Sequence, residues 1–147
     1  MLRCPINPAT VRRRTCDALA ERLSRFDALV EVGVGNRTDV AAALVEAGCA
    51  VRATDVVERE VPSIVDFFLD DVTDPDPSVY EETDAIYALN LPPELHRPAL
   101  DVAEAHDAAF AFTTLGGDVP DVPAEPETLP GETLFWARGP SPEQGPE

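Results

Sequence analysis

Two glycines that follow a short apolar run are the part of the sequence best suited to bind a ligand. Residues 28–32 are mostly apolar, Gly33 and Gly35 come next, and residues 39–47 have the composition of a helix. This order predicts a buried strand, a tight turn and a helix. Glycines at such a turn adopt positive φ and let a ligand approach the main chain closely, while the helix start offers unpaired N–H groups. The stretch therefore favours binding of a nucleotide-like small molecule.

An acidic residue, Glu31, lies two positions before the first glycine, where a buried strand normally carries an aliphatic side chain. Its carboxylate either accepts hydrogen bonds from the N–H groups of the turn or contacts the ligand, and both alternatives stay open. The residue three positions after Gly35 is Thr38, not the third glycine of a dinucleotide-binding fingerprint. Both features place a nicotinamide-dependent oxidoreductase last among the functions considered.

A second acidic residue, Asp55, ends the next apolar run, which spans residues 50–55 and predicts a second strand. Asp55 lies 20 residues beyond Gly35. That is about the spacing at which an acidic residue meets ribose hydroxyls in a βαβ nucleotide site. The alternative is that Asp55 only caps the turn after its strand.

Polar residues also follow the third and fourth predicted strands. Residues 64–69 predict a third strand at the sheet edge, and Asp70 and Asp71 come directly after it. These carboxylates either recognise an adenine amino group or simply form an acidic turn. Asn90 follows the fourth strand, predicted over residues 84–89, and either binds an amine substrate or hydrogen-bonds the backbone of its own loop.

Strands that alternate with helices predict an open α/β sheet, mostly parallel, with about five to six strands. Residues 56–63 are too few for an ordinary crossover helix. His96 precedes a helix expected to begin at Pro98, and a lone histidine there is typical of a capping or surface residue. The other expected elements are a helix over 8–25 capped by Asn7, a helical turn over 78–82, a strand over 108–114, an extended loop over 118–130 and an antiparallel edge strand over 131–138.

The composition indicates one acidic globular domain. The chain has 147 residues with a net charge of −17, and all 11 basic residues are arginines. We expect a single domain over residues 1–138 and a disordered polar tail over 139–147. The charge indicates a halophilic protein and argues against a broad nucleic-acid surface, and we interpret Arg12–Arg14 as a solvated helix face.

The cysteines and the hydropathy pattern indicate a cytoplasmic location. Cys4, Cys16 and Cys49 are odd in number and lack CxxC spacing, so neither a disulfide framework nor a zinc site is predicted. No apolar run approaches the ~20 residues that a membrane helix needs. We therefore expect a small-molecule ligand, no metal and no membrane partner.

With these residues in place, the sequence resembles the Rossmann-like class I S-adenosylmethionine-dependent methyltransferases, and specifically a small uncharacterised archaeal family with that fold. The specific part is the stretch from Glu31 to Gly35, which is similar to the first motif of that fold. The resemblance implies an open three-layer Rossmann-like sheet and S-adenosylmethionine as the cofactor. The element order from Leu19 to Arg138 agrees with it.

The resemblance also implies a role for each residue. Glu31 would steady the glycine turn, Gly33 and Gly35 would admit the methionine part of the ligand, and Asp55 would hold the ribose. Asp70 or Asp71 would meet the adenine amino group. Asn90 would line the methyl-acceptor site and be the candidate catalytic residue.

The chain also departs from that pattern. Arg37 stands where many members have a third glycine, and Leu91 stands where the acceptor motif has its first proline. Two functions therefore stand beside that of a methyltransferase. One is a non-catalytic ligand-binding or interaction module, which could work as a homodimer formed through the first helix or the last strand. The other is the oxidoreductase named above.

Overall fold

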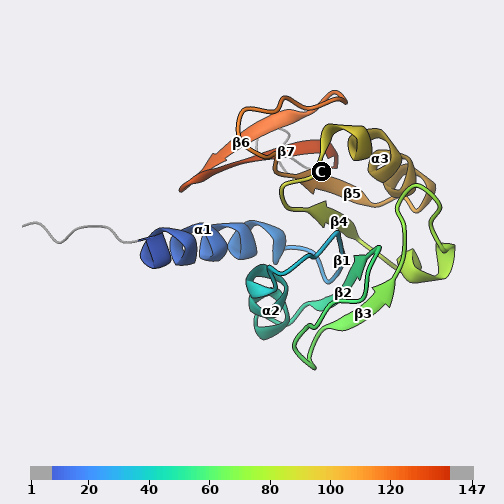
Figure 1. Cartoon of the computed structure of the whole chain (residues 1–147), viewed down its shortest axis with the longest axis horizontal. Helices are drawn as coiled ribbons and strands as arrows, with labels where there is room; N and C mark the ends of the chain where they lie inside the picture. The colour runs from blue at the N-terminus through green and yellow to red at the C-terminus, as the bar shows by residue number, and fades with distance from the viewer. Residues whose placement is uncertain (1–7, 140–147) are drawn as a thin grey trace, which may run out of the picture.

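A computed structural model describes residues 8–139, which form one seven-stranded sheet with helices on both faces (Figure 1). The strand order is β3-β2-β1-β4-β5-β7-β6. The first five strands in that order run parallel, and β7 and β6 are antiparallel to their neighbours. The strands are β1 (Ala28–Val32), β2 (Ala50–Asp55), β3 (Asp66–Leu69), β4 (Ala85–Ala88), β5 (Ala109–Phe112), β6 (Glu125–Leu129) and β7 (Glu132–Arg138).

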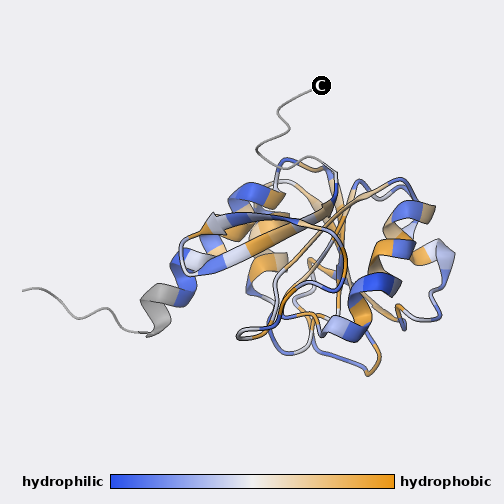
Figure 2. Cartoon of the chain, turned by 90° about the horizontal axis from the view of Figure 1, so that it is seen from above, coloured by the Kyte–Doolittle hydropathy of each residue, from blue (hydrophilic) through white to orange (hydrophobic). Residues whose placement is uncertain are grey.

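Buried apolar residues form two cores, one on each side of the sheet. Hydrophobic residues make up much of the strands, and hydrophobic and hydrophilic residues alternate along the helices (Figure 2). Helices α1 (Pro8–Leu23) and α2 (Asp39–Glu46) cover one face, with Leu19 and Leu44 fully buried. Helix α3 (His96–Ala105) covers the other face, where Phe110 and Phe112 are fully buried. The central strands β4 and β5 are buried at every position because both faces are covered.

The predicted fold class is confirmed, and one strand was missed. Residues 125–129 were expected to lie in an extended loop, but they form β6, so the sheet has seven strands rather than five to six. Consequently β7 lies inside the sheet and β6 forms the edge. The sequence of β6 has little β-propensity, and its pairing with β7 makes it a strand. Pro126 is tolerated because an edge strand needs no N–H on its outer side.

The helix around His96 also differs from expectation. α3 begins at His96, after a 3-10 turn (Pro93–Leu95), rather than at Pro98. The expectation that His96 is a capping or surface residue is wrong, since its side chain is fully buried. Its Nε2 lies 2.9 Å from the carbonyl oxygen of Leu91, and its Nδ1 accepts a hydrogen bond from the N–H of Asp121. The ring thus ties the start of α3 to the loop before β6.

The link from β2 to β3 has no helix, as the sequence predicted. No helix lies between β2 and β3, and a 3-10 turn (Pro77–Tyr80), capped by the side chain of Asp76, is the only helical element between β3 and β4 in the described chain. The predicted cap Asn7, Cys4 and nearly all of the predicted tail lie outside the described residues. None of the described helices is long and apolar enough to cross a membrane.

Candidate functional site

The glycine turn links β1 to α2 at the carboxyl edge of the sheet. Gly33 and Gly35 have φ of +71° and +58°, which non-glycine residues rarely adopt. Between them, Val34 is buried and its N–H donates to the carbonyl oxygen of Thr54 at 2.9 Å. Apart from the glycine itself and its two neighbours in the chain, no described residue has a heavy atom within 4 Å of the position that a Cβ would take at either glycine. The turn is therefore fixed against β2 and open on its outer side.

Asp55 meets the glycine turn directly. Its Oδ2 accepts a hydrogen bond from the N–H of Gly35 at 2.8 Å, and its Oδ1 accepts one from Val56 at 2.7 Å. The structure thus brings together the two residues that the sequence placed 20 positions apart. Asp55 also serves as the turn cap that was its alternative interpretation.

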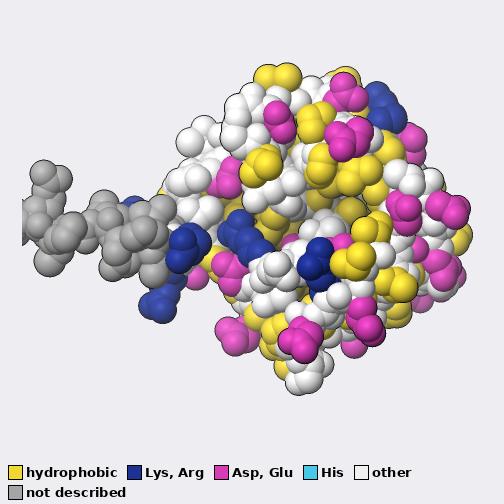
Figure 3. All heavy atoms as spheres, viewed as in Figure 1, with side chains coloured by type: hydrophobic (Ala, Val, Ile, Leu, Met, Phe, Trp, Pro, Cys, Tyr) yellow, Lys and Arg dark blue, Asp and Glu magenta, His cyan; other side chains and the backbone are white. Residues whose placement is uncertain are grey.

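A basic side chain lies over Asp55. The Nε of Arg59 lies 3.3 Å from Asp55 Oδ2, and its Nη1 lies 3.4 Å from the side-chain oxygen of Asn36. Both contacts are long, and Arg59 remains partly exposed. Figure 3 shows two groups of basic side chains near the middle of one face and acidic side chains around its margin. Because Arg59 contacts Asp55, which binds the turn, positive charge lies beside the turn in a strongly acidic protein.

Glu31 lies beneath the turn with its carboxyl group fully buried. The sequence offered the N–H groups of the turn or a ligand as partners for this carboxyl group. In the structure its Oε1 instead accepts a hydrogen bond from the hydroxyl of Tyr87 at 2.7 Å. Its Oε2 is buried without a hydrogen-bond partner among the described residues. Burial raises the pKa of Glu31 to about 8, and burial together with Glu31 raises the pKa of Tyr87 well above its ordinary value. Glu31 therefore holds a proton at neutral pH more readily than an ordinary carboxyl.

The carboxylates after β3 are used by their own loop. Asp70 accepts hydrogen bonds from the N–H of Asp76 at 2.9 Å and from the hydroxyl of Tyr80 at 3.2 Å. Burial raises the pKa of Asp70. Asp71 is exposed and accepts from the N–H and hydroxyl of Thr73, which lowers its pKa. These contacts agree with the acidic-turn interpretation.

Asn90 is the second residue after β4. It has φ of +55°, its N–H donates to the hydroxyl of Thr113 at 2.7 Å, and the residue is exposed. Leu91 is buried, and its N–H donates to the carbonyl oxygen of Thr113. The loop is therefore pinned to the end of β5, with the Asn90 side chain at the surface.

Sequence reasoning missed three residues of this edge: Tyr87, Arg59 and Thr113. Tyr87 becomes the partner of Glu31 because these two residues are directly opposed in the parallel pair β1–β4. That register cannot be derived from spacing along the chain. Arg59, four residues after Asp55, carried a visible signal as a basic residue in an acidic loop.

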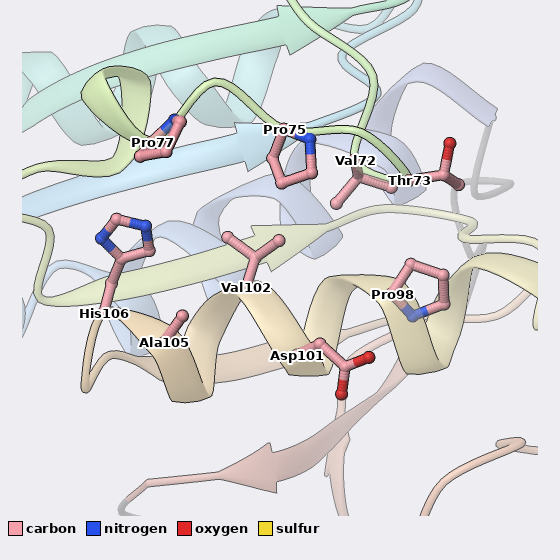
Figure 4. A pocket seen from close by; sticks show the side chains of 9 residues that line it. All are labelled: Val72, Thr73, Pro75, Pro77, Pro98, Asp101, Val102, Ala105 and His106. Carbon is pink, nitrogen blue, oxygen red and sulfur yellow. The ribbon is translucent and has the colours of Figure 1, made fainter.

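A separate cavity of about 360 Å³ lies away from the glycine turn, between α3 and the chain that links β3 to β4 (Figure 4). Val72 and Pro75 from that link face Val102 of α3 and His106, the residue directly after that helix. None of the predicted site residues lines this cavity. Three or more metal-ligating side chains do not cluster anywhere in the described chain.

Comparison with known sequences identifies the family. The profile of the uncharacterised protein family UPF0146 matches residues 15–138. The chain belongs to UPF0146. A UPF0146 protein of Halobacterium salinarum is 53% identical over 121 residues, which cover 82% of this chain and 94% of that relative. A UPF0146 protein of Pyrococcus furiosus is 32% identical over 112 residues, covering 71% and 85%. The expected small archaeal family is thereby confirmed.

Several methyltransferases are among the solved structures with a similar fold. Magnesium protoporphyrin IX methyltransferase from Synechocystis, solved with bound S-adenosylmethionine, gives a TM-score of 0.60 at 12% identity and covers 92% of this chain and 85% of its own. The N-methyltransferase NodS from Bradyrhizobium japonicum gives 0.59 at 14% identity, covering 91% and 100%. An RNA methyltransferase from Salinibacter ruber, in complex with S-adenosylhomocysteine, gives 0.56 at 18% identity, covering 95% and 97%. At these identities the likeness shows the methyltransferase-like Rossmann fold.

Proposed function

We propose that this UPF0146 protein binds S-adenosylmethionine or its demethylated product at the glycine turn, as a methyltransferase-like protein. The observation that supports this most directly is the hydrogen bond from Gly35 to Asp55, which joins an open glycine turn to an acidic strand end. It lies in a sheet whose neighbours in solved structures bind these sulfur ligands.

The residues present fit such a ligand at the turn. Positive φ and the empty space at Gly33 and Gly35 leave the main chain accessible to the methionine part. The buried Oε2 of Glu31 has no hydrogen-bond partner among the described residues, and it can donate a hydrogen bond at the turn while Glu31 holds its proton. Asp55 would hold ribose hydroxyls once Arg59, whose contact is long, moves aside. The bound ligand would supply an electrophilic methyl group, and these residues would position it.

The outer part of the ligand would lie over the loops after β3 and β4. Asp71 is better placed than Asp70 to accept a hydrogen bond from an adenine amino group, because Asp71 is exposed. The carboxylate of Asp70 already accepts hydrogen bonds from Asp76 and Tyr80. Asn90, exposed at the end of β4, would face the methyl acceptor and orient it.

A non-catalytic ligand-binding role is the second candidate, and the loop after β4 favours it. The side chain of Leu91 is buried and the backbone of Asn90 is tied to Thr113. Such a loop stabilises the sheet end whether or not an acceptor binds there. In this case the protein would bind the sulfur ligands without transferring the methyl group.

Calorimetric titration in molar potassium chloride tests the proposal with S-adenosylmethionine, S-adenosylhomocysteine and NAD in parallel. We expect saturable binding of the two sulfur ligands and loss of roughly a hundredfold in affinity for Asp55→Ala, because two or more hydrogen bonds to a carboxylate disappear. Asp118→Ala, which removes a carboxylate from an exposed loop, is the matched control and should bind normally. Binding of NAD alone would favour the oxidoreductase, and no binding by folded protein would refute the proposed site.

A further inference from the structure

Exposed apolar side chains gather at one end of the sheet. Among the described residues, five of the seven exposed large hydrophobic side chains lie on β3 and the loop before it: Val56, Val57, Ile64, Phe68 and Leu69. Soluble monomers rarely expose contiguous apolar patches, and such patches commonly mark interfaces. In a chain with a net charge of −17, this cluster calls for a physical explanation.

The exposure follows from the absence of α-helices in the two connections of β3. Where the chain enters and leaves this strand, it forms loops and one 3-10 turn instead of packing helices. Three of the four β3 residues are therefore exposed, whereas all four residues of β4 are buried. Phe67 is half-buried against one of the two cores, but Phe68 and Leu69 stay exposed, and β3 has no neighbour on its outer edge.

The opposite edge of the sheet is protected. β6 carries Pro126 between Glu125 and Glu127, and proline and charge are features that prevent edge strands from pairing. α1 also contacts this hairpin: Thr15 donates to the carbonyl oxygen of Pro130, and Arg22 forms an ion pair with Glu127. The first helix and last hairpin therefore contact each other within the chain, and β3 is the unprotected edge.

The backbone of β3 has a defined set of outward hydrogen-bonding groups. The N–H of Asp70 donates to the carbonyl oxygen of Asp55 on β2 at 3.0 Å. Because strand residues alternate in direction, the N–H and C=O of Phe68 also point toward β2. Those of Phe67 and Leu69 therefore point away from the sheet, toward any strand that adds to this edge.

We propose that two copies of this protein pair through β3 to form one continuous sheet. The strands run antiparallel about a twofold axis, with Phe68 opposite Phe68 of the second copy. Phe67 of each copy then lies opposite Leu69 of the other, and both residues present outward N–H and C=O groups. This register forms two hydrogen-bonded pairs and matches apolar with apolar side chains on both faces.

Other registers satisfy these conditions less well. A shift of one residue would place Phe68 opposite Leu69 of the other copy. The N–H and C=O of Phe68 point toward β2 and cannot bond the second copy, so this register is excluded. Centring the pair on Phe67 places Asp66 opposite Phe68, and centring it on Leu69 places Phe68 opposite Asp70. In the proposed register only the flanking pair, Asp66 with Asp70, brings like charges together, so salt should strengthen the dimer.

Sedimentation velocity in molar potassium chloride, over roughly a hundredfold range of protein concentration, tests the proposal. We expect a concentration-dependent dimer that weakens as the salt is lowered. Leu69→Pro removes the outward N–H together with the leucine side chain and leaves the pairing with β2 intact, so it should raise the dimer Kd roughly ten- to thirtyfold. Leu69→Lys should weaken the dimer to a similar extent. Val119→Lys, at a similarly exposed site on a loop outside β3, should leave the dimer Kd unchanged.

Disulfide trapping tests the register. In the proposed pair the two Phe68 Cα atoms are about 4.5 Å apart, within the ~4.4–6.8 Å that a disulfide spans. Phe68→Cys should therefore form a covalent dimer under mild oxidation. Leu69→Cys should not form a covalent dimer, because the Cα atoms of the two residues 69 are about 8 Å apart, too far for a disulfide. The wild-type chain controls for its own cysteines.

The remaining outcomes overturn the proposal. A folded protein that stays monomeric at every concentration and salt level would do so, as would a dimer that Leu69→Pro and Leu69→Lys leave intact. Cross-linking of Leu69→Cys but not Phe68→Cys would refute the register. Circular dichroism of each variant ensures that a monomer is a folded one.

Discussion

Two parts of the same sheet edge use their carboxylates differently. At the ends of β1 and β2, Asp55 binds Gly35 across 20 residues, and Glu31 binds Tyr87 across 56. At the end of β3, Asp71 binds Thr73 only two residues away. A long-range bond exists only once the sheet has formed, whereas a local turn needs only its own sequence. The first part is therefore built by the fold, and it is where we place the ligand.

The largest expected effect is the pH dependence that Glu31 gives to stability. The pKa of Glu31 is about 8 in the folded chain, above its ordinary value of 4.5. Between these values the folded state holds a proton that the unfolded state releases, so stability is fully present below about pH 5 and falls as the pH rises toward 8. We expect a loss of roughly 2–4 kcal/mol across this window, measured by chemical denaturation.

Glu31→Gln is the matched control for that effect. Glutamine keeps the shape and the acceptor for Tyr87 but does not titrate, so the variant should lose this part of the pH dependence. It should equal the wild type near pH 5 and exceed it in stability near pH 8. Parallel curves for the two proteins would contradict the account of a buried, protonated Glu31.

A smaller effect is expected at the glycine turn. Gly35→Ala forces a Cβ into positive φ and should lower the free energy of unfolding by about 1 kcal/mol. Gly117→Ala provides the comparison, since Gly117 has equal space but no positive φ, and it should be neutral or slightly stabilising. Denaturation curves measure both, and equal effects would mean that the turn is not constrained as described.

The smallest effect is expected at the second part of the edge. Asp71→Ala removes an exposed turn carboxylate whose bonds are local, so unfolding should change little. Its effect on affinity for S-adenosylhomocysteine should be only a few-fold, well below that of Asp55→Ala. An equal loss of affinity in the two variants would remove the distinction between the two parts.

Much of the fold follows from the sequence, and the reasons for the failures are physical. Apolar periodicity and glycines predicted β1, α2 and β2, where local pattern and tertiary structure agree. β6 was missed because pairing, not propensity, makes it a strand. His96 was misplaced because one of its partners, Asp121, lies 25 residues away.

The candidate site shows the same limit. Gly33, Gly35 and Asp55 followed from a known spacing, and the structure brings Gly35 and Asp55 together. Tyr87 depends on the register between β1 and β4, which the order of residues does not encode locally. The domain boundary near 138 and the ligand-binding or catalytic roles of all the site residues, including Glu31 and Asp55, stay predictions.

The central claim is that the ligand binds at the glycine turn, and amide NMR shifts on titration with S-adenosylhomocysteine test it most directly. In molar potassium chloride, we predict saturable shifts at Gly33, Gly35 and the residues after Asp55. Gly116 and Gly117, in the exposed loop after β5, should stay unmoved. Saturable shifts that cluster elsewhere, or no shifts at a ligand concentration that saturates known methyltransferases, would contradict the claim.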